Sequence, residues 1–204
     1  MADPQAAPPV RAAITGVILA GGAGRRLGGV DKGWLMLAGQ PLIVRVLARL
    51  VPQVSEVLIS ANRQLPDYRA LGWPVVTDTS PDAGPLAGIA AAAARAPGRF
   101  LQIVPVDAPL LPIDLVTRLA ARWSPPAVYA HDGQRAQPAF ALLETARARG
   151  AGAALAAGEH ALGRWLTRLG ARPVTLGPAT DFLNVNTPPD RRAALARLAA
   201  EEGR

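Results

Sequence analysis

The run at residues 14–20 most constrains the fold, because it is short, largely β-branched and apolar, and it ends in the pair Gly21-Gly22. Such a run is typical of a strand buried on both faces of a parallel sheet. Similar runs recur at 56–60, 75–77 and 101–106, and segments with apolar residues at helical spacing lie between and after them, at 42–50, 66–71, 85–96 and 112–123. Alternating strands and helices predict βαβ units. We therefore expect an α/β fold with three layers, doubly wound around a mostly parallel, Rossmann-like sheet.

The second half of the chain has a different order of predicted strands and helices. Strand-like segments at 127–131 and 138–143 flank the turn signal Asp132-Gly133, which predicts a pair of strands that run antiparallel. Segments 159–169 and 189–200 are helical in pattern. A chain of 204 residues fits one hydrophobic core, so we expect a single domain over 13–204, preceded by a disordered tail over 1–12 that is rich in Ala and Pro.

Charge and composition exclude several classes of function. The net charge is +7, but the basic residues are scattered without a block of like charge, so we expect no nucleic-acid partner and consider polyphosphate substrates instead. Cys is absent, which excludes disulfides and thiolate metal sites. No run of 18 or more apolar residues occurs, and the start of the chain lacks the pattern of a signal peptide, so we expect a cytoplasmic protein with no membrane partner.

The glycine-rich segment 21–29 follows the first predicted strand, where backbone N–H groups can bind phosphate. A Walker loop is excluded because Lys32 lies between Asp31 and Gly33 rather than between Gly and Ser or Thr. A dinucleotide fingerprint is excluded because Leu27 occupies the position of its third glycine. The segment therefore predicts a phosphate loop of another kind, and the simpler alternative is a tight turn with no ligand.

The segment 19–33 resembles the signature loop of the molybdenum cofactor guanylyltransferases, which belong to the nucleotidyltransferase superfamily. Its last part, Gly-Gly-Val-Asp-Lys-Gly at 28–33, resembles this family in particular, whereas the rest of the segment resembles the superfamily as a whole. The resemblance implies that Lys32 and Arg25 are catalytic, that Asp31 orients Lys32, and that the nucleotide is bound by Leu19, Ala20, Gly21, Gly22 and Lys32. Lys32 is the only lysine among 22 basic residues. An ammonium on a flexible stem is a compact charge that can follow phosphate oxygens as they move during a reaction.

Three further motif residues follow predicted strands or begin a helix. Asn62 lies in Ser-Ala-Asn-Arg and Asp78 in Thr-Asp-Thr, and an amide with a carboxylate can satisfy the edge of a purine or a ribose. Gly88 ends Gly-Pro-Leu-Ala-Gly, whose small residues let a backbone approach a base. The resemblance implies that all three contact the nucleotide. The alternatives are that Asn62 and Asp78 only form turns, and that the segment ending at Gly88 is only a tight turn and a helix start.

Asp107 follows the fourth predicted strand, within Val-Pro-Val-Asp-Ala-Pro. The superfamily uses this pattern to hold magnesium beside the α-phosphate, so the resemblance makes Asp107 a metal ligand as well as a catalytic and nucleotide-binding residue. One carboxylate is sufficient, because Mg²⁺ fills its octahedron with waters and phosphate oxygens.

Residues toward the C-terminus resemble the acceptor side of the family site. Asn184 and Asn186 lie in Asn-Val-Asn-Thr-Pro, and amides two residues apart on an extended segment face the same way. His131 begins His-Asp-Gly-Gln-Arg, which the family places near the pterin. The alternative for the first motif is a helix start with Thr187 as the cap and Pro188 at the first position, and both roles are compatible.

The resemblance covers about residues 14–190 and implies one reaction. It is the transfer of a guanylyl group from GTP to molybdenum-bound molybdopterin, giving the guanine dinucleotide cofactor and pyrophosphate, with Mg²⁺ as cofactor. GTP and molybdopterin are the expected small-molecule partners, and molybdenum-insertion enzymes or molybdoenzyme-specific chaperones the candidate protein partners. The alternatives left open are a CTP-dependent molybdopterin cytidylyltransferase, a sugar-phosphate nucleotidyltransferase and a non-catalytic nucleotide-binding module.

Overall fold

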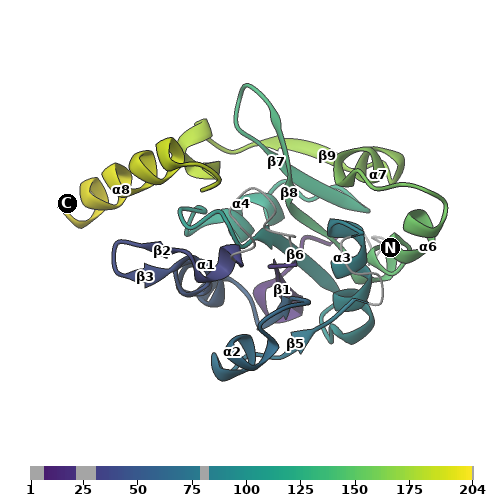
Figure 1. The fold of residues 1–204 in the computed structure, drawn as a ribbon. Helices are drawn as coiled ribbons and strands as arrows, with labels where there is room; N and C mark the ends of the chain where they lie inside the picture. The colour runs from purple at the N-terminus through teal and green to yellow at the C-terminus, as the bar shows by residue number, and fades with distance from the viewer. Residues whose placement is uncertain (1–6, 22–30, 79–82, 204) are drawn as a thin grey trace.

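The computed structural model describes residues 7–21, 31–78 and 83–203. Within these residues the chain forms a seven-stranded sheet in the order β5-β4-β1-β6-β8-β7-β9 (Figure 1). The strands are β1 (Ile14–Leu19), β4 (Glu56–Ser60), β5 (Val75–Val76), β6 (Phe100–Pro105), β7 (Ala127–His131), β8 (Ala136–Glu144) and β9 (Arg172–Thr175). The strands β5, β4, β1 and β6 are mutually parallel. The strand β8 runs antiparallel to both β6 and β7, while β9 is parallel to β7. The predicted mostly parallel sheet and its antiparallel pair are therefore confirmed.

Helices cover both faces of the sheet, which confirms the three-layer arrangement. One face carries α1 (Leu42–Leu50), α2 (Leu65–Ala70) and α4 (Leu115–Ala120), and the other carries α3 (Pro85–Arg95), α5 (Thr145–Ala148), α6 (Ala151–Ala156) and α7 (Leu162–Arg168). Alternate residues of β1 point to opposite faces: Ile18 packs in the first layer and Val17 in the second. Burying one such side chain contributes about 1.5–3 kcal/mol, and these two layers supply most of the core.

A third, smaller core joins two segments far apart in the sequence. The hairpin of β2 (Met36–Leu37) and β3 (Gln40–Pro41) packs against the final helix α8 (Pro188–Glu202), which lies at the edge of the molecule (Figure 1). The buried members of this hairpin–α8 core are Leu37, Leu42, Leu110, Val185, Ala194 and Leu198. The predicted start of α8 is confirmed, since the Thr187 side chain accepts from the N–H of Asp190 and completes a capping box. The segment just after Lys32 and the last helix are thus packed together.

Several boundaries differ from the sequence expectation. The helix predicted over 112–123 is shorter, and α7 begins at Leu162 rather than at 159, because the buried Glu159 carboxylate accepts from the N–H of Ala161 ahead of the helix. The elements without a sequence prediction are the β2–β3 hairpin, β9, α5, α6 and the 3-10 turns η1 (Arg11–Ala13), η3 (Lys32–Trp34), η4 (Val51–Gln53) and η5 (Ala179–Phe182). The turn η1 lies across the boundary expected between tail and domain.

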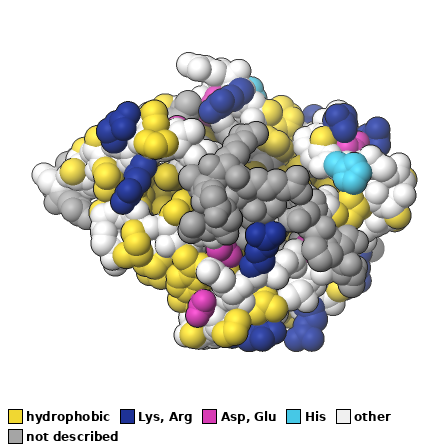
Figure 2. Space-filling view, in the orientation of Figure 1, with side chains coloured by type: hydrophobic (Ala, Val, Ile, Leu, Met, Phe, Trp, Pro, Cys, Tyr) yellow, Lys and Arg dark blue, Asp and Glu magenta, His cyan; other side chains and the backbone are white. Residues whose placement is uncertain are grey.

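Two observations on the described residues concern a membrane or a nucleic acid as a partner. None of the helices in the described ranges is long and apolar enough to cross a membrane. On the face shown in Figure 2, the described Lys and Arg side chains occur singly or in pairs and do not merge into one continuous basic patch.

Candidate functional site

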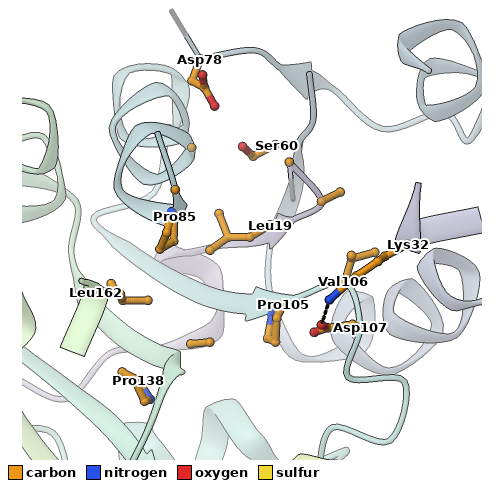
Figure 3. Close-up of a pocket in the computed structure, with 15 residues that line it drawn as sticks. Leu19, Lys32, Ser60, Asp78, Pro85, Pro105, Val106, Asp107, Pro138 and Leu162 are labelled. Carbon is orange, nitrogen blue, oxygen red and sulfur yellow. Dashed lines mark hydrogen bonds and ion pairs between the residues drawn. The ribbon is translucent and has the colours of Figure 1, made fainter. Parts of the chain in front are cut away.

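A pocket of about 360 Å³ lies beyond the carboxyl ends of the parallel strands. In an open α/β sheet this edge is where ligands bind, because successive strand ends and their loops meet there. Figure 3 shows Lys32 and Asp107 together at one end of this pocket and Asp78 at another. The lining residues are Leu19, Ala20, Gly21, Lys32, Ser60, Asp78, Gly84, Pro85, Gly88, Pro105, Val106, Asp107, Pro138, Ala139 and Leu162.

The end of β1 forms a fixed backbone wall of this pocket. Ala20 donates its N–H to the Ser60 carbonyl at 2.8 Å, and the Leu19 carbonyl accepts from the N–H of Val106 at 3.1 Å. The chain is therefore held on both sides where the glycine-rich segment begins. Gly22 and Arg25, two of the predicted site residues, lie outside the described residues.

Gly88 has a packing reason to be glycine. A Cβ atom there would lie 2.4 Å from the Ser60 Oγ and 3.3 Å from a methyl carbon of Leu19. The absence of a side chain lets the first turn of α3 approach the ends of β4 and β1, and this close approach shapes the pocket wall. The prediction placed Gly88 in the site, and the structure places it in the lining.

Lys32 brings together residues from three distant segments. Its Nζ donates to the Asp107 Oδ2 at 3.0 Å and also to the Asn186 Oδ1. Asp107 follows β6, and its carbonyl accepts from the N–H of Val185 at 2.7 Å, so the segment before α8 is tied to the same point. The Lys32 and Asp107 side chains are 25% and 14% exposed, which places this ion pair partly out of bulk water and strengthens it.

The sequence interpretation had Asp31 orienting Lys32, and in the structure Asp31 contacts the turn that carries Lys32. The Asp31 Oδ1 accepts from the N–H of Gly33 at 2.9 Å and from the hydroxyl of Tyr68 at 2.7 Å. A short carboxylate at the start of a turn reaches its own backbone more readily than the head of a long neighbouring side chain. Asp31 is thus the N-cap of η3.

Asn62 and Asp78 pair with one another, across 16 residues of sequence. The Asn62 Nδ2 donates to the Asp78 Oδ2 at 2.8 Å, and the Asp78 N–H donates to the Asn62 Oδ1 at 3.2 Å. Asp78 lines the pocket, and Asn62 lies behind it with its amide 3.6 Å from the position of a Cβ on Gly21. An amide and a carboxylate held in this way offer both donors and acceptors to a polar ligand.

The three residues predicted on the acceptor side lie in different environments. Asn186 contacts Lys32, while the buried Asn184 Oδ1 has no hydrogen-bond partner within the described parts of the chain. The His131 Nδ1 accepts from the Gly133 N–H at 3.0 Å at the end of β7, and His131 is not a lining residue.

The turn after His131 is organised by a buried carboxylate. Asp132 accepts from the backbone N–H groups of Arg135 and Gln134 and from the Gln137 side-chain amide. The Arg135 N–H, followed by the Gln137 amide and the Gln134 N–H, lowers the pKa of Asp132 to about 2. This carboxylate therefore stays ionised within its own turn.

Several lining residues were not predicted from the sequence. Ser60 and Pro85 lie inside motifs already described, and Pro138 begins the strand predicted at 138–143, so each was next to a recognisable signal. Leu162 lies in none of these motifs. It lines the pocket because α7 packs in the second helical layer, which the local sequence does not specify.

Comparisons with known proteins agree with this geometry. The model of the MobA-like NTP transferase domain matches residues 16–173. A molybdenum cofactor guanylyltransferase from Serratia proteamaculans is 46% identical over 180 residues, which cover 87% of this chain and 91% of that protein.

Two solved structures share the fold. Molybdopterin-guanine dinucleotide biosynthesis protein A from Archaeoglobus fulgidus superimposes with a TM-score of 0.75 at 22% identity, covering 91% of this chain and 99% of that one. The 2-C-methyl-D-erythritol 4-phosphate cytidylyltransferase from Thermus thermophilus gives 0.67 at 20% identity, covering 90% and 98%. With a family model that matches most of its length and a close relative over nearly all of it, this chain belongs to the molybdenum cofactor guanylyltransferases, within the MobA-like NTP transferases.

Proposed function

We propose that the protein transfers a guanylyl group from GTP to molybdenum-bound molybdopterin, giving the guanine dinucleotide form of the cofactor and pyrophosphate. The observation that carries this proposal is the Lys32–Asp107 pair in a pocket at the carboxyl ends of parallel strands. Family membership supports the choice of both substrates, since the relative from Serratia proteamaculans is named for this activity.

The pocket offers different chemistry at its two ends. The Lys32–Asp107 end carries an ammonium and a carboxylate, which suit phosphates and a cation, and the Asn62–Asp78 end carries hydrogen-bonding groups, which suit a base or ribose. We assign the triphosphate to the first end and the nucleoside to the second. The backbone of Leu19, Ala20 and Gly21 runs along the pocket wall between the two ends. It would bind the part of the nucleotide that lies between the triphosphate and the nucleoside ends.

Asp107 fits the role of a magnesium ligand. Mg²⁺ is bound by one or two carboxylates together with water and substrate phosphates, so a cage of protein ligands is not required. No cluster of three or more His, Cys, Asp or Glu side chains with the spacing of a metal site occurs within the described ranges, and Asp107 presents its carboxylate to the pocket at the phosphate end. When bound, Mg²⁺ would neutralise charge on the phosphate oxygens.

The reaction needs positioning and positive charge more than proton transfer. An oxygen of the terminal phosphate of molybdopterin forms a bond to the α-phosphorus of GTP, while the bond from that phosphorus to the bridging oxygen of the β-phosphate breaks. The nucleophile is already ionised, so no general base is required. Lys32 has three N–H donors, of which Asp107 and Asn186 each accept one, and the same ammonium can donate to a phosphate oxygen as negative charge builds up.

The test is a transfer assay with the purified chain, Mg²⁺, molybdopterin and GTP labelled at the α-phosphorus. We expect the label in a pterin product and an equal amount of unlabelled pyrophosphate. Transfer from labelled CTP in place of GTP would instead identify a cytidylyltransferase, and transfer to a sugar phosphate a different acceptor class. Binding of nucleotide with no transfer to any acceptor would indicate that the protein is a non-catalytic nucleotide-binding module.

A further inference from the structure

The turn that carries Lys32 rests on one buried aromatic side chain from a different segment. Tyr68, in α2, is fully buried and lies in the main core beside the half-buried Trp34. Tyr68 is far from Lys32 in sequence and is not a lining residue of the pocket. Its contacts nevertheless converge on the residues that flank Lys32.

Three flanking residues contact Tyr68, each in a different way. The Asp31 carboxylate accepts from the Tyr68 hydroxyl at 2.7 Å. Gly33 lies so near that a Cβ atom would be 2.2 Å from the same hydroxyl oxygen, a distance that only glycine avoids. The Trp34 ring packs against the Tyr68 ring with centroids 5.3 Å apart and planes tilted by 49°.

The hydrogen bond to Asp31 is well suited to fixing the turn. Burial raises the pKa of Tyr68 far above its usual value, and the hydrogen bond to Asp31 adds to this effect, so the hydroxyl remains a donor at all ordinary pH values. Asp31 is itself buried, and a buried carboxylate that loses a donor is strongly disfavoured. The same oxygen also accepts from the Gly33 N–H, so the hydroxyl and the turn backbone share one acceptor.

The position of this turn determines what Lys32 can reach. A lysine side chain has a flexible stem, so its ammonium is held at one point only if its backbone is held and its partners lie at the right distance. The partners Asp107 and Asn186 belong to other segments, which follow β6 and precede α8, so both contacts depend on where η3 lies relative to those segments. A small displacement of η3 would therefore separate Lys32 from both.

We propose that Tyr68 is a positioning residue for Lys32, which it holds at the phosphate end of the pocket through Asp31, Gly33 and Trp34. This inference rests on the proposed function for its kinetic readout. It also accounts for the two residues beside the lysine in the motif Asp-Lys-Gly: the carboxylate accepts from the tyrosine, and the glycine makes room for it.

The kinetic test compares two substitutions that remove the same atom. Tyr68→Phe keeps the ring in the core and removes only the hydroxyl, and Tyr129→Phe does the same to the chain's only other tyrosine, on β7 outside the pocket lining. We expect Tyr68→Phe to lower kcat/KM for GTP about tenfold, mainly through kcat, because misplacement of a catalytic group acts on the chemical step. Tyr129→Phe should stay within about twofold of the wild type.

A double variant tests whether Tyr68 acts through Lys32. If it does, Lys32→Ala/Tyr68→Phe should have the same kcat/KM as Lys32→Ala alone, because the group to be positioned is already gone. A further tenfold loss in the double variant would show that the hydroxyl supports the fold in general and would overturn the proposal. So would a Tyr68→Phe variant with wild-type kcat/KM.

A second readout needs no nucleotide. Because Lys32 is the only lysine, a chain grown with lysine labelled with ¹³C at Cε gives a single Cε signal by nuclear magnetic resonance, with no assignment required. We expect this signal to move toward that of free lysine in Tyr68→Phe and to stay in place in Tyr129→Phe. An unmoved signal in Tyr68→Phe would overturn the proposal. A moved signal in a protein that fails to use GTP would support the positioning role while the proposed function failed.

Discussion

The two parts of the sheet contribute differently to the pocket. In the parallel part (β5, β4, β1 and β6), each strand or the loop after it delivers a lining residue at its carboxyl end, including Leu19, Ser60, Asp78 and Asp107. The other part (β8, β7 and β9) contributes Pro138 and Ala139, which lie within β8 rather than at its end. Polar chemistry therefore comes from the parallel strand ends, and the remainder of the sheet supplies an apolar wall.

The same contrast appears in one pair of residues. Asp132 directly follows β7 and Asp107 comes two residues after the end of β6, and both have largely buried side chains. Asp107 faces the pocket and accepts from Lys32, whereas Asp132 is occupied by the N–H groups of its own turn. We therefore expect the aspartate of the parallel part to bind ligand and that of the other part to hold its turn, and matched substitutions should separate the two roles.

The largest effect on activity is expected at Asp107. Asp107→Ala should lower turnover by about a thousandfold or more, because the carboxylate proposed to hold the cation and position Lys32 is lost. The melting temperature should change little, since the side chain faces a pocket and fills no core. The transfer assay over a range of Mg²⁺ concentrations, with thermal unfolding in parallel, measures both. Near-normal activity at ordinary Mg²⁺ would show that another residue binds the ion.

Removing the ammonium should come next in size. Lys32→Ala should lower kcat/KM about a hundredfold, the range for a preorganised charge at the reacting phosphates. Lys32→Arg should recover only part of this, because a guanidinium spreads the charge over a rigid plane that does not fit the site of a point charge. Steady-state kinetics with saturating acceptor gives both values. Full activity in Lys32→Ala would exclude any role at the phosphates.

The nucleoside end should show a smaller effect, on binding rather than on turnover. The wild type should bind GTP with Mg²⁺ more tightly than ATP or CTP. Asn62→Ala removes both hydrogen bonds to Asp78 and should weaken GTP binding about tenfold, or about 1.4 kcal/mol. Calorimetric titration with the three nucleotides gives the comparison. Equal affinity of the wild type for all three would contradict the assignment of guanine to this end.

The smallest effect on activity is expected at Asp132. Asp132→Asn should keep kcat/KM near that of the wild type, since the side chain accepts from its own turn and from Gln137 of β8, and neither Asp132 nor Gln137 lines the pocket. Its effect should be on acid stability. The pKa of Asp132 is lowered from 3.8 to about 2, so its contribution is complete above pH 4 and is lost as the pH falls toward 2.

The measurement for Asp132 is urea unfolding across this pH range. The wild type should lose more stability than Asp132→Asn between pH 5 and pH 2, because only the wild type must take up the proton. Parallel losses in the two proteins would show that the carboxylate has no special role in the turn.

The predictability of the elements follows the same division of the sheet. The strands of the parallel part were predicted to within one or two residues, because both faces are buried and glycine or proline often lies close to their ends. The strand β9 left no signal, since Val174 is its only buried residue and the sheet edge allows Arg172 and Pro173 there. The helices α5 and α6 are short and rich in alanine, so they show little apolar periodicity.

The site divides in a similar way. Asp78 and Asp107 were predictable because the parallel topology brings the ends of strands to one edge, and Lys32 was predictable because it lies in the motif segment that follows β1. The pairing of Asp31 with Tyr68 was not, because it depends on how α2 packs beneath η3, and no local pattern specifies a contact between two such positions. The resemblance to a family indicated candidate site residues, part of which line the pocket, and only packing showed which residues hold the others.

The hairpin–α8 core has a consequence for synthesis on the ribosome. Domains can form while the chain is still growing, and the strands of the parallel part (β5, β4, β1 and β6) have all been synthesised once residue 105 has been added. Asn186 lies in the last tenth of the chain and is held in place by a helix that forms after it. A chain that stops after Thr175 would contain every strand of the sheet yet lack the amide that contacts Lys32. The contact of this amide with Lys32 can therefore form only when translation is nearly over.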